Sequence, residues 1–303
     1  MMTLPRTWIA AVAASWLLAA TPAQAQDKQG PTRVDSITGS VQILELATKA
    51  LPGPRTLRVY LPPGYQQEVS RRYPVLYLHD GQNVFSGLTS FLPNGEWKAD
   101  EAAQALIEAG LIEPIVIVAI DNAGARRADE YLPTRAKVDG REMGGEADRY
   151  GKLLVEEIKP HIDATFRTKR DARNTAVGGS SLGGVISLYL GLTYPQVFGK
   201  LALLSPSLWW DSKVMLEKVR ALDARQLGKR RPQIWLDTGT SEGSGEGSGE
   251  AVTSVRELSK LLQGRGWKPG KDLAVYVEGY AIHREDAWAR RMPVILLYLF
   301  GRK

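Results

Sequence analysis

The 303-residue sequence contains no cysteine. This absence excludes disulfide bridges, zinc sites built on thiolates and catalysis by a thiol nucleophile. Histidine is also scarce, with three in the chain, and no His-x-x-x-His spacing or clustered His/carboxylate spacing occurs. A metallohydrolase is therefore not expected, and we predict neither a metal site nor a cofactor.

Long apolar runs are missing except near the start of the chain, at residues 8–20. This run follows Arg6, is short for a membrane span, and precedes a small-x-small cleavage signal at residues 23–25. We therefore expect residues 1–25 to be a signal peptide and residues 26–303 to form one exported domain, periplasmic or secreted, with no stable membrane insertion. An uncleaved N-terminal anchor is the alternative.

A strong excess of one charge is lacking as well. The formal net charge is +6, and it falls to +5 when Arg6 is removed with the predicted signal peptide. Basic residues form only short clusters, at residues 126–127 and 229–231, and no basic stripe interleaved with aromatic residues occurs. Nucleic acid is therefore not an expected partner, and the mild positive bias suits an anionic ligand or envelope surface.

Strand and helix patterns alternate along the rest of the chain. Strands are predicted at residues 41–47, 56–61, 74–78, 115–120, 174–177, 201–204, 233–236 and 273–277, and helices at 97–109, 146–158, 182–192, 213–222, 252–262 and from 284. The first two strands are expected to pair antiparallel. Strands separated by helices predict a single α/β domain, with a mostly parallel central sheet and helices on both faces.

Two segments lack a regular pattern. Residues 122–145 are polar, contain glycine and follow a strand end, where long loops are usually functional or disordered. Residues 241–249 form a low-complexity run of serine, glycine and glutamate. We predict both segments to be irregular, the second as a mobile lip or a solvated insertion.

Residues 179–183 read Gly-Ser-Ser-Leu-Gly, which contains the Gly-x-Ser-x-Gly pattern of a nucleophile elbow. A strand pattern precedes it and an apolar helix pattern follows, as such an elbow requires. The serine of the pattern, Ser181, is therefore the predicted nucleophile. The alternative is a glycine-rich turn that only lets a strand and a helix pack closely.

A serine hydroxyl needs a base to take its proton, and the base is usually histidine. His283 follows the last predicted strand, which fits the chain order serine, acid, histidine. His79 ends a buried strand but precedes the serine, and His161, at a helix end, is expected to be structural. The acid should follow the strand at residues 233–236, where Asp237 and Glu242 both qualify. Spacing alone leaves these two carboxylates open.

An oxyanion hole needs backbone N–H groups aimed at the developing negative charge. The first donor should be the N–H of Leu182, directly after the nucleophile. The second should come from the turn at residues 79–83, where Gly81 allows a close approach and the N–H of Gln82 is the candidate. We interpret Asp80 in the same turn as a residue that braces the loop.

These segments together resemble the putative-esterase family of α/β-hydrolases, which includes enterochelin-esterase-like proteins, esterase D, feruloyl esterases and mycolyltransferases. The matching segments are residues 78–83, 179–184, 205–210, 237–242, and His283 with Trp288 after it. The resemblance implies an α/β-hydrolase fold, Ser181 as nucleophile and His283 as base. It also implies Glu242 as the acid, with Asp237 a turn residue, and it agrees with Gln82 as the second oxyanion donor.

The substrate pocket is expected to be aromatic and positively charged. Trp209 and Trp210 follow a strand end, and the resemblance puts this segment beside the pocket. Arg126, Arg127 and Tyr131 lie in the long segment after another strand end and could clamp an anionic substrate. The alternatives are core packing for one tryptophan and plain solvation for the arginines. Such a pocket would suit an aromatic acyl group.

The predicted function is therefore an exported serine esterase that acts through a Ser-Glu-His triad and an acyl-enzyme. The expected substrate is a small-molecule or polysaccharide-linked ester, either a siderophore triester or an aryl-acyl ester such as a feruloyl ester. The alternatives are an acyltransferase that uses the same acyl-enzyme and an inactive binding or envelope protein of the same fold. The sequence leaves the oligomeric state open.

Overall fold

The computed structural model describes residues 33–138, 140–223, 231–243 and 249–302. The predicted signal peptide, residues 1–25, lies outside the described residues, as do the middle of the low-complexity run and most of the basic cluster at residues 229–231. Among the described residues, no helix is both long enough and apolar enough to cross a membrane.

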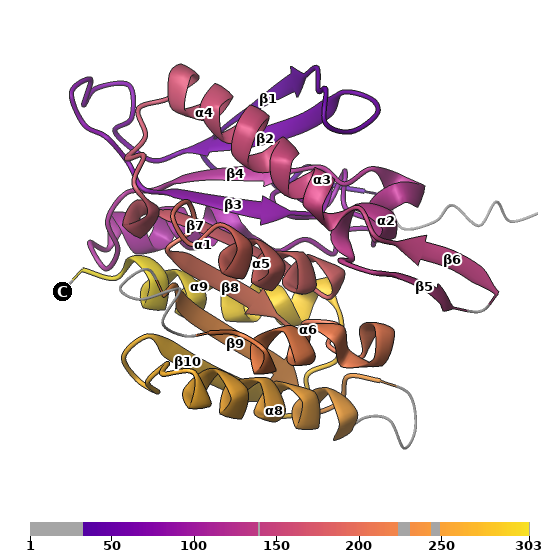
Figure 1. Cartoon of the computed structure of the whole chain (residues 1–303). Coiled ribbons are helices and arrows are strands. Elements are labelled where there is room, and N and C mark those ends of the chain that lie inside the picture. Colours follow the sequence, from indigo (N-terminus) through magenta and orange to yellow (C-terminus); the bar gives the residue numbers. More distant parts are fainter. Residues whose placement is uncertain (1–32, 139, 224–230, 244–248, 303) are drawn as a thin grey trace, which may run out of the picture. The chain divides into compact units, whose positions relative to one another are not determined.

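Eight strands form one central sheet in the order β1-β2-β4-β3-β7-β8-β9-β10 (Figure 1). Their bounds are β1 (Ser40–Leu46), β2 (Arg55–Leu61), β3 (Val75–His79), β4 (Val116–Ile120), β7 (Thr175–Ser180), β8 (Lys200–Leu204), β9 (Gln233–Gly239) and β10 (Leu273–Glu278). β1 pairs antiparallel with β2 and β2 antiparallel with β4, while all pairs from β4 to β10 are parallel. This confirms the predicted mostly parallel sheet and its opening antiparallel pair.

Helices cover both faces of the sheet (Figure 1). One face carries α2 (Arg127–Tyr131), α3 (Ala147–Lys152), α4 (Lys159–Thr165), α5 (Leu182–Thr193), α6 (Trp210–Arg220) and α8 (Glu250–Gly264), and the other carries α1 (Ala99–Glu108) and α9 (Glu285–Phe300). The two hydrophobic cores on either side of the sheet hold the side chains of these helices. The arrangement confirms the predicted α/β-hydrolase fold.

Strand β4 shows how the sequence produces these layers. All of its residues are buried, and successive side chains point to opposite faces, so Val116, Val118 and Ile120 enter one core while Ile117 and Ala119 enter the other. Burying each larger apolar side chain contributes about 1.5–3 kcal/mol, so a strand buried on both faces stabilises both cores. The unbroken apolar run therefore marks an interior strand of the sheet.

Two predicted segments differ from the structure. Residues 122–145 are not irregular, because they form a 3₁₀ turn, η2 (Gly124–Arg126), helix α2 and an antiparallel hairpin of β5 (Arg135–Val138) and β6 (Arg141–Gly144). The helix predicted at residues 146–158 continues to residue 165 through a π-helical segment, η3 (Leu153–Ile158). Pro160 lies where the π-helical segment passes into α4 (Lys159–Thr165).

Candidate active site

Ser181 lies on a sharp turn between β7 and α5. Its backbone has φ 57° and ψ −120°, and a positive φ is uncommon for a residue that carries a side chain. A Cβ on Gly179 would come within 2.8 Å of the backbone of Gly183, so only glycine lets the turn close so tightly. The turn leaves Ser181 partly exposed beyond the carboxyl end of β7.

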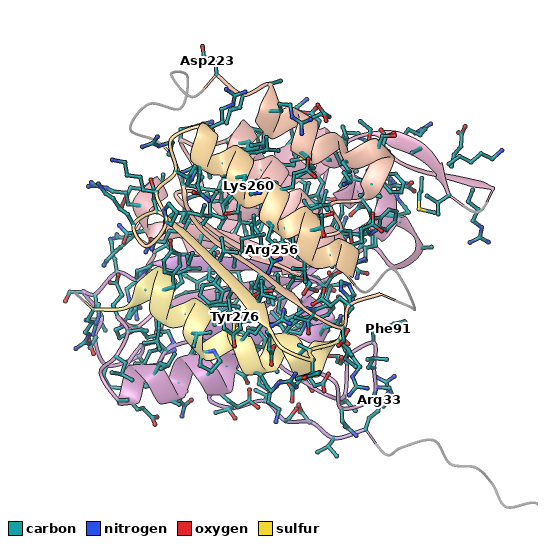
Figure 2. All side chains as sticks on the ribbon, turned by 90° about the horizontal axis from the view of Figure 1, so that it is seen from below. Arg33, Phe91, Asp223, Arg256, Lys260 and Tyr276 are labelled. Atoms are coloured by element: carbon teal, nitrogen blue, oxygen red, sulfur yellow. The ribbon has the colours of Figure 1, made fainter. Side chains whose placement is uncertain are left out.

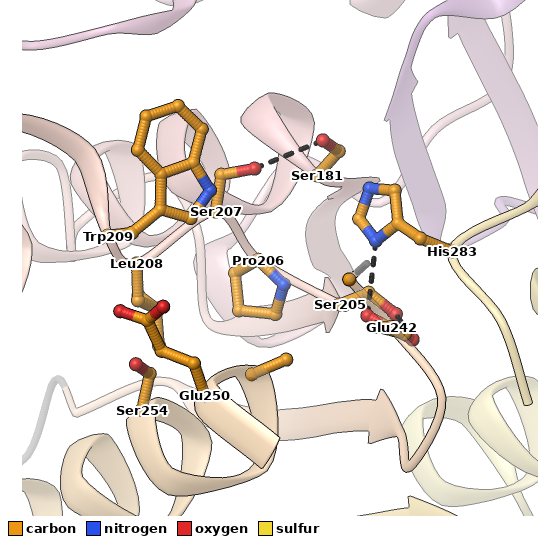
Figure 3. Close-up of a pocket in the computed structure, with 12 residues that line it drawn as sticks. Ser181, Ser205, Pro206, Ser207, Leu208, Trp209, Glu242, Glu250, Ser254 and His283 are labelled. Atoms are coloured by element: carbon orange, nitrogen blue, oxygen red, sulfur yellow. Dashed lines mark hydrogen bonds and ion pairs between the residues drawn. The ribbon is translucent and has the colours of Figure 1, made fainter. Parts of the chain in front are cut away.

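The Ser181 hydroxyl is hydrogen-bonded to the hydroxyl of Ser207, with 3.1 Å between the two oxygens (Figure 3). The backbone N–H of Ser207 also donates to the carbonyl oxygen of Ser181 over 3.1 Å. Ser207 follows β8, the parallel neighbour of β7, so both serines lie at the carboxyl ends of adjacent strands. This second serine therefore helps to fix the side chain of the first.

An imidazole and a carboxylate meet at the ends of the next two strands. Glu242 follows β9 and His283 follows β10, and these strands are parallel neighbours. His283 Nδ1 lies 3.1 Å from Glu242 Oε2, and the other nitrogen of the ring faces Ser181 (Figure 3). The structure thus brings together a serine, a histidine and a carboxylate from three separate loops.

Glu242 is 4% exposed, yet its surroundings favour the ionised carboxylate. Burial acts to raise its pKa, but hydrogen bonds from His283, the Ser205 hydroxyl and the Gly239 N–H outweigh burial, so the pKa of Glu242 is lowered. The Ser205 hydroxyl donates over 2.5 Å and the Gly239 N–H over 2.6 Å, both to Oε1. An ionised Glu242 can accept the Nδ1–H of His283 and so fix its tautomer.

A buried arginine from α9 supports this carboxylate. Arg291 is 1% exposed, and its Nη1 donates to Asp237 over 2.7 Å and to the Ser205 hydroxyl over 3.0 Å. Its Nη2 lies 3.5 Å from Glu242 Oε1, and its Nε donates to Glu278 of β10 over 2.7 Å. We call Arg291, Asp237, Ser205 and Glu278 the Arg291 brace. The brace connects α9, β8, β9 and β10 behind Glu242.

Asp237, the alternative acid, is part of that brace and has no hydrogen bond to His283 among the described residues. Its oxygens accept from the Trp235 indole N–H over 2.7 Å, from Arg291, and from the Ser205 N–H over 3.1 Å. It is fully buried within β9, so it is not the turn residue that the resemblance implied. Burial raises the pKa of Asp237 to about 6 despite the attraction of Arg291.

The wall opposite Glu242 comes from the turn after β3. Asp80 has φ 58°, and Arg127 of α2 binds both of its carboxylate oxygens, at 2.6 Å and 2.8 Å. The Asn122 side-chain amide donates to the same carboxylate over 2.6 Å. We call Asp80, Arg127 and Asn122 the Asp80 brace.

The Asp80 brace fixes a short 3₁₀ turn, η1 (Gly81–Asn83). A Cβ on Gly81 would come within 2.6 Å of the backbone of β4, so this turn, too, depends on glycine. Gln82 of the turn lines a cavity that also contains Ser181, and its side-chain oxygen accepts from the Asn122 N–H over 3.2 Å. The backbone of Gln82 is thereby held beside the serine.

Two of the three histidines lie away from this site. His79 is fully buried at the end of β3, with Nδ1 2.9 Å from the Tyr150 hydroxyl, and burial lowers its pKa to about 3. His161 lies on α4. Tyr131, predicted to contact substrate, is also fully buried, packs against His79 and accepts the Asp80 N–H over 3.3 Å. It belongs to the core behind the Asp80 turn.

The other predicted substrate contacts are divided between cavity and core. Trp209 is 52% exposed and lines a cavity beside Ser181. Trp210 is 2% exposed, and its indole N–H donates to the Thr134 carbonyl over 3.3 Å, so it packs in the core instead. Arg126 pairs with Glu146 at 2.5 Å and lines neither cavity beside the serine, because its helix directs it toward α3.

Two cavities open on either side of Ser181 and His283, which line both. The smaller, about 390 Å³, is also lined by Ser205, Pro206, Ser207, Leu208, Trp209, Glu242, Gly243, Glu250, Ala251 and Ser254. The larger, about 970 Å³, is also lined by Arg33, Asp80, Gln82, Asn83, Thr89, Ser90, Phe91, Leu92, Asn122, Gly124, Arg127, Ser180, Arg284, Glu285 and Trp288. Within the described part of the chain, no cluster of three His, Asp or Glu side chains could hold a metal ion.

The sequence analysis did not identify Ser207 or Arg291 as parts of the site. A signal for Arg291 was present, since it falls on the same helical face as Trp288, Met292 and Ile295, all of which are buried. An arginine on an apolar helix face needs buried partners, and Asp237 supplies one. No comparable signal exists for Ser207, because its role depends on how β7 and β8 pair.

Comparison with known proteins agrees with the fold. The sequence is 32% identical over 196 residues to an endo-1,4-beta-xylanase/feruloyl esterase of Xylanibacter ruminicola, covering 64% of this chain but 25% of that protein. It is 28% identical over 252 residues to the iron(III) salmochelin esterase of Escherichia coli, covering 78% of this chain and about half, 52%, of the relative. The crystal structure of BES protein from Bacillus cereus superposes with a TM-score of 0.69 at 20% identity, over 89% of this chain and 98% of that one.

A family comparison covers most of the chain. The sequence model of the family described as "Putative esterase" matches residues 48–299, a range that begins before β2 and includes all of α9 but its last residue. The relatives include a feruloyl esterase and a salmochelin esterase. The chain therefore belongs to this esterase family.

Proposed function

We propose that the protein is a serine esterase in which Ser181 is the nucleophile, His283 the general base and Glu242 the acid that orients it. The observation that carries the proposal is the hydrogen bond of 3.1 Å between His283 and the buried Glu242, with the free ring nitrogen facing Ser181 (Figure 3). A serine alone is a weak nucleophile, and this arrangement is what activates it.

In the first half of the reaction, His283 Nε2 takes the proton of the Ser181 hydroxyl as the oxygen attacks the ester carbonyl carbon. The tetrahedral intermediate collapses, the C–O bond to the alcohol breaks, and His283 gives its proton to the leaving oxygen. In the second half, water repeats the attack on the acyl-enzyme and releases the acid. Glu242 stays ionised throughout and stabilises the imidazolium, as its lowered pKa favours.

The oxyanion is bound in this proposal by the N–H groups of Leu182 and Gln82. Leu182 is the first residue of α5, whose N-terminal N–H groups are not used by the helix itself. Gln82 lies in the turn that the Asp80 brace fixes, and it lines the larger cavity together with Ser181. Preorganised donors of this kind usually supply the largest single part of catalysis.

The substrate class that we propose is an ester with an aromatic group, of the siderophore-triester or aryl-acyl kind. Two solvent-facing aromatic side chains support it, since Phe91, 77% exposed, lines the larger cavity and Trp209 lines the smaller. The names of the relatives, a feruloyl esterase and siderophore esterases, point the same way. We further propose that residues 1–25 direct export to the periplasm or outside, and that Gln26 becomes the N-terminus.

A panel of esters assayed with the mature protein tests this function. We expect hydrolysis of p-nitrophenyl acetate and butyrate, with kcat/KM roughly 10- to 200-fold higher for feruloyl esters or a catecholate triester. No hydrolysis of any ester would refute the esterase and favour a binding protein of the same fold. Product esters appearing when a second alcohol is added, in place of free acid, would favour acyl transfer. Mass spectrometry of exported protein that retains Met1 would refute the signal peptide.

A further inference from the structure

Glu285 is a buried carboxylate that the proposed mechanism does not use. It begins α9, two residues after His283, is 7% exposed and lines the larger cavity. Among the described residues, no side chain donates a hydrogen bond to it or forms an ion pair with it. The carboxylate accepts one hydrogen bond, from its own backbone N–H in the first turn of α9. A buried carboxylate with a single donor keeps unused acceptor positions, which cost folding free energy unless another group fills them.

The other charged side chains of this cavity have partners. Asp80 and Arg127 bind each other through two hydrogen bonds. Arg284 donates to both oxygens of Asp286, at 2.8 Å and 3.0 Å. Arg33, exposed at the cavity, donates from Nη1 to the carbonyl oxygens of Leu88 and Ser90, and in Figure 2 it lies on the same side of the molecule as Phe91.

Among the described charged side chains that line the larger cavity, Glu285 is therefore the buried one whose oxygens can still accept hydrogen bonds. Burial raises the pKa of its carboxyl despite the hydrogen bond from its own N–H and the attraction of His283, and repulsion from Asp80 adds to the rise. Arg127 does not neutralise the charge of Glu285, because its guanidinium already binds both oxygens of Asp80. A hydroxyl of a bound molecule would satisfy Glu285 without bringing a second negative charge into the cavity.

We propose that Glu285 is a specificity residue that accepts a hydrogen bond from a hydroxyl group of the substrate in the larger cavity. The inference rests on the proposed esterase function and narrows its substrate class. It replaces the expectation of an arginine clamp for anionic groups, because Arg127 is bound to Asp80 and Arg126 lies outside both cavities. Hydroxylated esters should therefore be preferred to esters that carry a carboxylate at the same position.

Two matched series of esters test the proposal. One consists of methyl cinnamates that carry hydroxymethyl, methyl or carboxylate at the para position, and the other of phenyl acetates with the same three groups. The first places the variable group on the acyl part and the second on the alcohol part, so one series reaches the larger cavity whichever way the ester binds. Each enzyme is compared by the ratio of kcat/KM for the hydroxymethyl ester to that for the carboxylate ester, which cancels differences in reactivity.

The wild-type ratio should exceed one in at least one series, and Glu285→Gln should reduce it by roughly tenfold, the factor for one charge-assisted hydrogen bond. Glu285→Ala should reduce it at least as much, and either variant suffices if the other fails to fold. The matched control is Asp286→Asn, which removes the same charge one residue away. The wild-type Asp286 side chain pairs with Arg284 and Arg290 and lines neither cavity. The ratio for this control should stay that of the wild type.

Ratios unchanged by both Glu285 variants would overturn the proposal, as would an equal change in Asp286→Asn, which would indicate a diffuse field instead of a contact. A wild-type preference for the carboxylate ester would also overturn it and would point to Arg33. These results differ from a failure of the esterase function itself, in which the wild type would not hydrolyse p-nitrophenyl acetate at all.

Discussion

The two walls of the site are held by arginines in contrasting ways. In the Asp80 brace, Arg127 is partly exposed, at 26%, and makes one bidentate pair with one carboxylate. In the Arg291 brace, the arginine is 1% exposed and its donors are shared among Asp237, Ser205 and Glu278, with Glu242 at 3.5 Å. The first brace fixes one turn, whereas the second joins three strands and a helix.

This difference predicts different consequences for the same kind of substitution. Both arginines pair with a buried carboxylate, since Asp80 is 2% exposed, but Arg127 is itself partly solvated and Arg291 is not. Loss of Arg127 should therefore reduce stability less than loss of Arg291, and it should also affect catalysis through the position of the Gln82 N–H. The Arg291 brace should matter for both the folded state and the position of Glu242.

The largest effect is expected at the carboxylate that meets the imidazole. Glu242→Gln should lower kcat by about 10⁴-fold, because an amide at this position favours the wrong tautomer of His283. Asp237→Asn, in the Arg291 brace, should instead reduce the free energy of unfolding and leave kcat much closer to that of the wild type. Steady-state kinetics and urea unfolding on both variants check this, and a larger loss of kcat in Asp237→Asn would reverse the roles.

The second prediction compares the stability lost on removing a buried arginine of α9 with that lost on removing an exposed one. Arg291→Met should reduce the free energy of unfolding by about 3–5 kcal/mol, because Asp237 is left buried without its cation. Arg291→Lys should recover part of that loss and part of kcat, since one ammonium can still meet Asp237. Arg290→Met is the matched control, because Arg290 is 53% exposed and should change stability by less than about 1 kcal/mol. Equal losses at both positions would contradict the account.

The third effect distinguishes a brace from a substrate clamp at Arg127. Arg127→Met should lower kcat roughly 10- to 100-fold, less than the complete loss of an oxyanion donor, because it releases the Asp80 turn. A clamp would instead raise KM and leave kcat unchanged. Arg126→Met, one residue away and outside both cavities, should alter neither constant appreciably. A pure KM effect at Arg127 would restore the clamp.

The fourth effect, the smallest when counted per pH unit, is a pH dependence of stability on the Asp80 side. His79 has its pKa lowered by burial to about 3, below the usual value of about 6.5, so between these values the unfolded chain binds more protons than the folded one. Stability should therefore fall as the pH drops from about 6.5 toward 3, by up to about 1.4 kcal/mol per pH unit from this residue. His79→Gln should flatten that slope in urea unfolding series and His161→Gln should not. An unchanged slope in His79→Gln would contradict the account.

Much of this architecture was predictable because its signals are local. The β-branched run of β4 and the glycines around Ser181 each identify an element without reference to the rest of the chain. The choice between Asp237 and Glu242 is different, because Asp237 lies near the end of β9, Glu242 lies just after it, and only the return of the chain from β10 brings His283 to one of them. Spacing carries no information on that return.

The substrate contacts were the least predictable part. Trp209 and Trp210 are adjacent in sequence, yet Trp209 faces a cavity and Trp210 is buried beside Thr134, because adjacent side chains leave the chain in different directions. Arg126 and Arg127 diverge likewise, the first toward Glu146 and the second toward Asp80. The charge of Arg127 alone suggested an anionic ligand, and only the contact with Asp80 shows that the protein itself supplies the anion.

Covalent labelling of the nucleophile tests the central claim most directly. The protein would be treated with a fluorophosphonate, digested, and the modified residue located by mass spectrometry, with Ser181→Ala and Glu242→Gln as comparisons. We predict one adduct, on Ser181, that is lost in Ser181→Ala and forms far more slowly in Glu242→Gln. An adduct on Ser180 or Ser207, or no adduct on folded protein that still hydrolyses p-nitrophenyl acetate, would contradict the account.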